Sequence, residues 1–139
     1  MADDQRVAVL KHHRIPESEW DNWLLAGDGI AHRTAKVDHR TTIGANAVIS
    51  SFAEIEEHVT IHINSVVSPY AIVRRFATIA YGAVICPHAE VGPYSLVDRF
   101  AVVGAYARIR PYAIVDKSTV VHPYSIVDMF ACIDGPTRE

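Results

Sequence analysis

The chain has 139 residues and a mass of 15.4 kDa; half of its residues are hydrophobic and 21% are charged, which fits one globular domain and excludes a disordered chain. Thirteen Lys and Arg against sixteen Asp and Glu give a net charge of −3, so no excess of positive charge marks a nucleic-acid-binding surface. No apolar run reaches the roughly 18 residues of a membrane helix, and the N-terminus lacks the layout of a signal peptide. We therefore expect neither nucleic acid nor a membrane as a partner, and a location in the cytoplasm or within an assembled particle.

The first predicted element is a short amphipathic helix in the segment IPESEWDNWLLAGDG, residues 15–29. Pro16 suits the first turn of a helix, Glu17 and Glu19 favour its positive end, and Gly27 can end it. We expect residues 1–35 to form an N-terminal cap that covers the open end of the structure that follows. A docking arm for a partner is the alternative for this region.

A six-residue repeat begins at Val37 and ends at Ile133, and all seventeen positions at this spacing are Val or Ile. The residue two before each of them is small or β-branched, so both residues face the same side of a short strand and the residue between them faces outward. The three remaining residues of each repeat turn a corner. Five of the seven prolines lie in this corner phase: Pro69, Pro87, Pro93, Pro111 and Pro123.

This pattern resembles the bacterial transferase hexapeptide-repeat family, and IGANAV at 43–48 and VGPYSL at 91–96 fit its consensus closely. The resemblance implies an all-β fold, a left-handed parallel β-helix in the form of a triangular solenoid with about five to six coils of 18 residues. We expect residues 36–135 to form this β-helix, with the short helical cap before it and residues 136–139 as a C-terminal tail.

A pitch of 18 residues sorts the outward strand positions into three faces. Glu90 and Arg108 stand one coil apart on the face that carries most of the charged residues, so they can form an ion pair. Cys86 and Cys132 fall in different columns, which argues against a disulfide. An unbroken column of valines on an outer surface indicates that this face is covered rather than exposed to solvent. The first face carries Val48, Val66, Val84, Val102 and Val120; the second carries Thr42, Thr60, Thr78, Leu96, Ile114 and Cys132; the third carries Lys36, Glu54, Ile72, Glu90, Arg108 and Ile126.

Nine of the ten Phe and Tyr residues share one corner phase and are predicted to stack as aromatic ladders. One corner carries Phe52, Tyr70, His88, Tyr106 and Tyr124, and another carries Phe76, Tyr94, Tyr112 and Phe130. Exposed apolar stripes of this extent favour a subunit interface over ladder stability alone, and the family resemblance implies a homotrimer. The predicted interface comprises Val48, Val66, Val84, Val102, Val120, Leu96, Ile114, Phe76, Tyr94, Tyr112, Phe130, Tyr70, Tyr106 and Tyr124.

The family includes acyltransferases that use a histidine base in a groove between subunits, so the histidines are the candidates for chemistry. His88 and His122 are the two alternatives for a catalytic base, because both lie in corner phases and His88 has Glu90 two residues on. No carboxylate stands at a spacing that guarantees an orienting partner for either. The related gamma-class carbonic anhydrases bind zinc through three histidines; here His58 and His62 are expected on different corners, so we predict no metal site.

We predict a non-catalytic structural or scaffold protein that assembles as a homotrimer into a larger complex, such as a virion or another multi-protein machine, with other proteins as partners and no cofactor. The uninterrupted coils and the lack of a convergent polar site support this reading. The alternative is an acyltransferase that uses acetyl-CoA or acyl-CoA, with a histidine base at a subunit groove. A gamma-class carbonic anhydrase is a further alternative.

Overall fold

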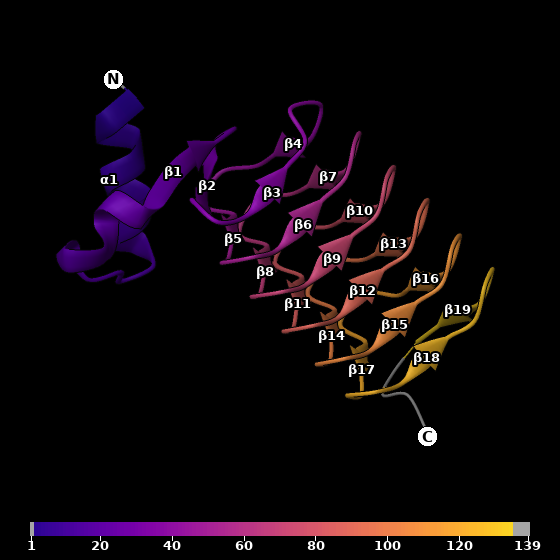
Figure 1. Cartoon of the computed structure of the whole chain (residues 1–139). Helices are drawn as coiled ribbons and strands as arrows, with labels where there is room; N and C mark the ends of the chain where they lie inside the picture. The colour runs from indigo at the N-terminus through magenta and orange to yellow at the C-terminus, as the bar shows by residue number, and fades with distance from the viewer. Residues whose placement is uncertain (1, 135–139) are drawn as a thin grey trace.

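The computed structural model describes residues 2–134; the predicted tail at 136–139 and the last residue of the predicted β-helix lie outside the described residues. The chain forms a three-sided solenoid of parallel sheets with a helical segment at its N-terminal end (Figure 1). Strand partners are 18 residues apart throughout, as in the pairing of Glu90 with Arg108. The predicted fold and its pitch are confirmed.

Each sheet of the solenoid forms one face, and the outward residues give the faces their names. The valine face contains β1 (Trp23–Ala26), β2 (Gly29–His32), β5 (Val48–Ile49), β8 (Val66–Val67), β11 (Val84–Ile85), β14 (Val102–Val103) and β17 (Val120–Val121). The threonine face contains β4 (Thr42–Ile43), β7 (Thr60–Ile61), β10 (Thr78–Ile79), β13 (Leu96–Val97), β16 (Ile114–Val115) and β19 (Cys132–Ile133). The charged face contains β3 (Lys36–Val37), β6 (Glu54–Ile55), β9 (Ile72–Val73), β12 (Glu90–Val91), β15 (Arg108–Ile109) and β18 (Ile126–Val127).

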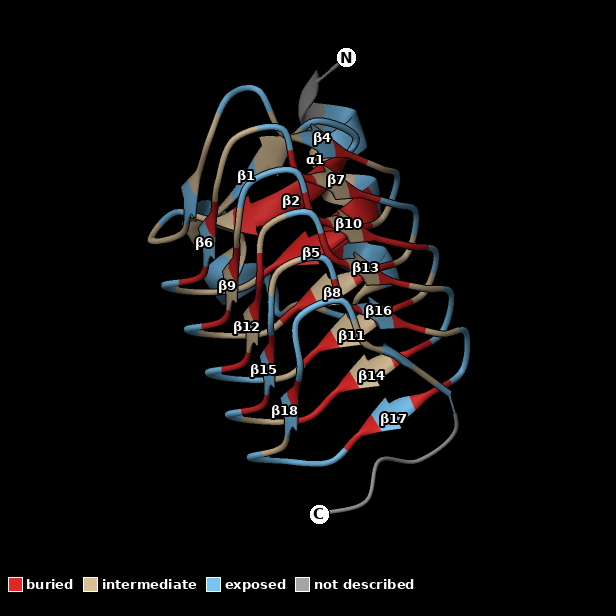
Figure 2. Cartoon of the chain, turned by 90° about the vertical axis from the view of Figure 1, so that its right-hand side faces the viewer, coloured by how far each residue is buried: buried red, intermediate tan, exposed pale blue. Residues whose placement is uncertain are grey.

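The core is the interior of the prism, where the repeated aliphatic and small residues stack coil upon coil. Ile79, Ile85 and Val91 have no exposed surface, and neither do Ala83 and Ala89 of the small columns. Figure 2 shows that exposed residues gather at the outer corners of the coils. Because each Å² of buried apolar surface stabilises a fold by about 25 cal/mol, these columns are the main source of stability.

The N-terminal region differs from the predicted helix at 15–29. The α-helix α1 spans Ala2–His12, a short 3-10 helix spans Glu17–Asn22, and β1 then pairs with β2 as an antiparallel hairpin. The turn is Gly27–Asp28, and Gly27 has φ of +56°, which is typical of the first turn position in a type II′ hairpin. Gly27 therefore ends no helix; it lets the chain reverse so that β1 covers the first edge of the valine face.

The helix α1 packs on the first strands of the valine face. Val9 and Leu10 of α1 form a buried cluster with Ile30 and Val48, and Trp20 and Trp23 lie against it. The Arg6 guanidinium donates hydrogen bonds to the backbone oxygens of Trp20 at 2.8 Å and Trp23 at 3.1 Å. Val48 therefore faces α1 of its own chain, unlike the predicted role in a subunit interface.

Both predicted aromatic ladders are present, and His58 joins the second one. Tyr94 and Tyr112 stack with ring centroids 5.0 Å apart and an angle of 3° between the rings. The first ladder, after the valine face, runs through Phe52, Tyr70, His88, Tyr106 and Tyr124, and the second, after the charged face, runs through His58, Phe76, Tyr94, Tyr112 and Phe130.

All ten ladder residues have a left-handed backbone, with φ between 57° and 66°, which is uncommon for bulky side chains. Backbone hydrogen bonds between coils hold this conformation: the Tyr94 N–H donates to the Arg75 oxygen, and the Tyr112 N–H donates to the Pro93 oxygen, both at 3.1 Å. The stacked rings offset part of the conformational cost, because each pair contributes about 0.5–1.5 kcal/mol.

Replacement of Tyr94 separates the two effects. We expect Tyr94→Ala to lower the free energy of unfolding by about 1–3 kcal/mol, because it removes two stacked contacts and keeps the strained φ. Tyr94→Gly loses the same contacts and relieves about 1 kcal/mol of strain, so it should unfold at a higher urea concentration than Tyr94→Ala. Equal midpoints for Tyr94→Ala and the control Tyr94→Phe would contradict a stabilising ladder.

Candidate functional site

A shallow groove with a volume of about 680 Å³ lies over the first coils of the charged face. Its walls come from β3, β6, the corners that follow these strands, and single residues before β3 and after β9. The lining residues are Ala35, Lys36, Val37, Asp38, Ile55, Glu56, Glu57 and Arg75.

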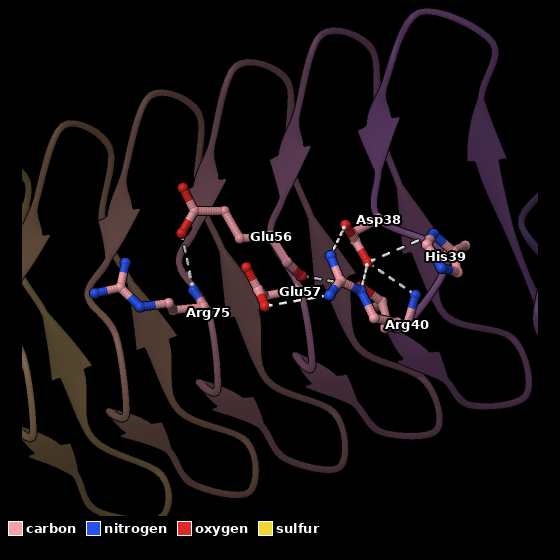
Figure 3. Close-up of polar contacts among 7 residues, drawn as sticks. Asp38, His39, Arg40, Glu56, Glu57 and Arg75 are labelled. Carbon is pink, nitrogen blue, oxygen red and sulfur yellow. Dashed lines mark hydrogen bonds and ion pairs between the residues drawn. The ribbon is translucent and has the colours of Figure 1, made fainter.

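Asp38, which lines the groove, forms a bidentate ion pair with Arg40 (Figure 3). The Arg40 Nε and Nη2 donate to the two Asp38 oxygens at 3.0 Å each, and the Arg40 backbone N–H donates to Oδ1 at 2.9 Å. These hydrogen bonds from Arg40 lower the pKa of Asp38 from 3.8 to about 2. Asp38 is therefore a poor proton acceptor near neutral pH.

Arg74 links two acidic residues on neighbouring coils. Its Nη1 donates to Glu56 at 2.9 Å, and its Nε donates to Glu90 at 3.0 Å. Partial burial raises the pKa of Glu56, but the hydrogen bonds from the Arg74 side chain and the Arg75 backbone N–H outweigh it, so the pKa is lowered. Arg108 lies 3.7 Å from the other oxygen of Glu90, which confirms the predicted pair.

The groove is thus an ion-pair network rather than an acid–base site. Glu57 also lies 3.4 Å from Arg40, so Asp38, Glu56 and Glu57 each have a cationic partner. A general base must take a proton near the working pH, and the lowered pKa values of Asp38 and Glu56 oppose that role. We therefore assign the network to the stability of the first coils.

Acid pH should weaken the fold through this network. The folded-state pKa of Asp38 is depressed, so its contribution is complete above 3.8 and is lost as the pH falls toward about 2. We expect the urea midpoint of the wild type to fall across this window. Asp38→Asn should lower the midpoint at pH 7 and have little effect at pH 2; an equal effect at both pH values would contradict the role of the carboxylate.

The two candidate bases lie on the same corner, after the valine face, but in different coils. His88 follows β11 as the middle ring of the first ladder, with ring centroids 4.9 Å from Tyr70 and 4.7 Å from Tyr106. His122 follows β17, two coils further on, and is exposed. The structure does not bring the two histidines together, and the rings of Tyr70 and Tyr106 fix the plane of the His88 imidazole.

The predicted interface residues lie on the surface, apart from Val48. Val66, Val84, Val102 and Leu96 are half-buried, and Val120 and Ile114 are 40% and 38% exposed. The ladder residues of this set are all exposed: Phe76, Tyr94, Tyr112, Phe130, Tyr70, Tyr106 and Tyr124. They form two stripes along adjacent edges of the prism.

Two further observations concern metals and membranes. Among residues 2–134, no three His, Cys, Asp or Glu side chains gather closely enough to hold a metal ion. His58 stacks on Phe76 after the charged face, whereas His62 follows the threonine face, so they lie on different corners as predicted. In the same part of the chain, no helix has the length and hydropathy to cross a bilayer.

Solved structures with a similar fold include CoA-bound enzymes. A variant of AntD, an N-acyltransferase from Bacillus cereus in complex with dTDP and coenzyme A, aligns with a TM-score of 0.67 and 16% identity over 77% of this chain and 76% of that one. PerB from Caulobacter crescentus, in complex with CoA and GDP-perosamine, aligns with a TM-score of 0.56 and 16% identity over 78% of this chain. This chain spans half the length of PerB. A search of curated proteins finds no match.

These CoA-bound neighbours contradict two predictions, that of a non-catalytic scaffold and that of no cofactor. The scaffold prediction relied on an uninterrupted prism without a convergent polar site in one chain. A prism of this shape also occurs in enzymes, so neither feature excludes catalysis. The family described as GMPPB C-terminal domain matches residues 25–132, more than three quarters of the sequence, and the chain belongs to this family.

Proposed function

We propose that this protein is an acyltransferase that moves an acyl group from an acyl-CoA thioester to an amine or hydroxyl of a nucleotide-linked sugar. The observation that carries the proposal is the similarity of the solenoid to two CoA-bound structures, one an N-acyltransferase with dTDP and the other in complex with GDP-perosamine. At 16% identity this similarity concerns the fold, so the chemistry has to come from this chain's own residues.

His88 is the proposed general base. Its ring lies between Tyr70 and Tyr106, which hold the plane of the imidazole while its edge stays exposed at the corner of the prism. A base held in one orientation loses little entropy when it meets its substrate. His122 remains the alternative base on the same corner.

The chemical step needs one proton acceptor that later becomes a donor. The amine nitrogen or hydroxyl oxygen of the sugar attacks the thioester carbonyl carbon, while His88 takes the proton from that nitrogen or oxygen. The carbon–sulfur bond then breaks, the electron pair leaves with the sulfur, and the imidazolium returns the proton to the CoA thiolate. The products are the acylated acceptor and free CoA.

A subunit groove completes the proposal. The outward side chains of the valine face from Val66 to Val120, of which Val120 is exposed and the others are half-buried, form an apolar stripe directly beside the corner that carries His88. Apolar surface of this kind is typical of an interface between copies. A homotrimer that covers the valine face would place a neighbouring subunit beside His88 and shield the thioester from water.

Binding and turnover of acyl-CoA test the proposed function directly. We expect acetyl-CoA or a longer acyl-CoA to bind in calorimetry, and free thiol to appear only when a nucleotide-linked amino or hydroxy sugar is also present. His122→Gln should leave this activity unchanged if His88 is the base. Failure of acetyl-CoA and of longer acyl-CoA thioesters to bind at millimolar concentration would overturn the proposal.

A further inference from the structure

Figure 1 shows β17, β18 and β19 in the last described coil of the prism, each at the edge of its sheet. In the preceding coil, the outward residue Arg108 donates its backbone N–H to the Ser125 oxygen at 2.9 Å. Ile126 is the equivalent residue of β18, and this strand pairs with β15 on its other side. Within residues 2–134, neither the Ile126 nor the Asp128 N–H has an acceptor. The edge of β18 is therefore open to a strand from outside this part of the chain.

Both aromatic ladders end on this coil with one ring face open. Tyr124 stacks on Tyr106 with ring centroids 5.0 Å apart, and is 72% exposed, whereas Tyr106 is 47% exposed. Phe130 stacks on Tyr112 at 5.1 Å and is 70% exposed, whereas Tyr112 is 48% exposed. The inner rings have a neighbour on each side, and the end rings have one. Two flat apolar surfaces are therefore available to the rings of another molecule.

A buried hydroxyl group at the same end also lacks a partner. In an earlier coil, Ser65 occupies the small inward position, and its Oγ donates to the Ala80 oxygen of the following coil at 2.8 Å. Ser125 occupies the same position of the repeat in the last described coil. Its Oγ is buried and has no hydrogen-bond partner within residues 2–134. Its hydroxyl therefore indicates a further layer of backbone over this coil.

The register of the sequence opposes a further coil of the same kind. Ile133 is the last Val or Ile at the six-residue spacing, and the next position of the register is Glu139. A carboxylate in the interior column is unfavourable, because its charge has no water or cation there. The covering layer is therefore sought in another molecule rather than in a continuation of the repeat.

The positions of the two end rings fit a second copy of this chain. Tyr124 and Phe130 lie at opposite ends of β18, three residues before and three residues after Val127. A two-fold axis through Val127, perpendicular to the charged face, brings β18 of two copies together as antiparallel strands. Each Tyr124 then lies over Phe130 of the other copy. Paired strands are about 4.8 Å apart, close to the ring spacing within the ladders, so the open end is complementary to itself.

We propose that two copies of this chain associate end to end, with β18 of one copy paired to β18 of the other. In this arrangement Ile126 lies opposite Asp128 of the other copy, and their N–H groups enter the hydrogen-bonded ladder. The aromatic ladders run on through both copies. The contact leaves the three faces of the prism uncovered, so it does not depend on the proposed function or on a trimer through the valine face.

Hydrogen exchange of the full chain at low and at high micromolar concentration tests what covers this edge. We expect the amides of Ile126 and Asp128 to exchange at least about tenfold more slowly at the high concentration. Sedimentation should show a particle of twice the mass appearing over the same range. Fast exchange at both concentrations would overturn the proposal. Slow exchange that is independent of concentration would also overturn it, and would indicate a cover from residues 135–139 of the same chain.

Variants of Ile126 test the strand pairing. Ile126→Pro removes the open N–H, and proline is tolerated on an edge strand, so the fold should persist by circular dichroism while the Kd of the end-to-end dimer rises by about tenfold or more. The matched control Ile126→Thr keeps the N–H and the branched side chain, so its Kd should stay within about threefold of the wild-type value. A wild-type Kd for Ile126→Pro would contradict the pairing.

A pair of charged variants tests the register and does not require the proline variant to fold. Ile126 is 53% exposed, so a charged side chain can replace it without burial. Opposite Asp128 of the other copy, Ile126→Lys should lower the dimer Kd and Ile126→Asp should raise it, each by about threefold or more at low salt, because the contact occurs twice. Shifts in the same direction, or no shift in either variant, would overturn the proposed arrangement.

Discussion

Val115→Asp should unfold the C-terminal coils, whereas Ile114→Asp, one residue earlier, should leave them folded. Val115 has no exposed surface and lies in the interior column, while Ile114 is 38% exposed on the threonine face. An unpaired carboxylate in the apolar interior costs several kcal/mol, a large part of the about 5–15 kcal/mol that stabilises a domain. Because each coil contacts only its neighbours, the damage should spread from this coil to the end of the solenoid.

Circular dichroism and hydrogen exchange measure this contrast. We expect Val115→Asp to lose strand signal and the exchange protection of the amides after β13, and Ile114→Asp to keep both. Both original residues are branched aliphatics on the same two-residue strand, so strand propensity alone predicts equal effects. Equal loss in the two variants would contradict the alternation of inward and outward positions.

The six-residue period was enough to predict the faces, the pitch and the ladders. Val and Ile recur at the inward positions of every strand, so residues 18 apart are predicted to lie in adjacent coils. The structure confirms this for Glu90 with Arg108 and for Tyr94 with Tyr112. The predicted second ladder begins at Phe76 and therefore omits His58, although the predicted first ladder includes His88. The phase of His58, 18 residues before Phe76, was a sufficient signal.

The N-terminal region could not be predicted in the same way, because it lacks the repeat. The segment at 15–29 has helix-forming features, yet the Gly27–Asp28 turn and the pairing of β1 with β2 prevail. The burial of Val48 beneath α1 is a tertiary contact between distant segments, and no periodicity within the solenoid indicates it. The acidic start and the basic end, Lys11 and His12, were the available signals for α1.

The ion-pair network was predicted only in part, for a geometric reason. A column pattern places Glu90 and Arg108 in adjacent coils, but the closer partner of Glu90 is Arg74, which reaches it from a corner position rather than from the face. Long flexible side chains cross between columns, so pairing by register alone misses such contacts. The division of the chain at residues 35 and 135 and the sites of association between copies stay predictions.

His88→Phe should abolish acyl transfer without loss of stability. Phenylalanine occupies the same ladder phase at Phe52, so it can stack between Tyr70 and Tyr106 in place of the imidazole. It cannot accept a proton, and loss of a general base lowers turnover by about 10²- to 10⁴-fold. We expect kcat to fall by this factor, while the Kd for acyl-CoA and the melting temperature stay near their wild-type values.

Two control variants limit the interpretation of that result. Tyr106→Phe changes a ring on the same ladder and removes no proton acceptor at His88, so it should retain turnover. His88→Ala removes both the base and the stacked ring, so it should lose turnover and also melt at a lower temperature than His88→Phe. These variants alter ring stacking and proton transfer separately. Full activity of His88→Phe would therefore exclude His88 as the base, whatever the stability of the variant. His122, the other candidate on this corner, would then be tested by the same substitution.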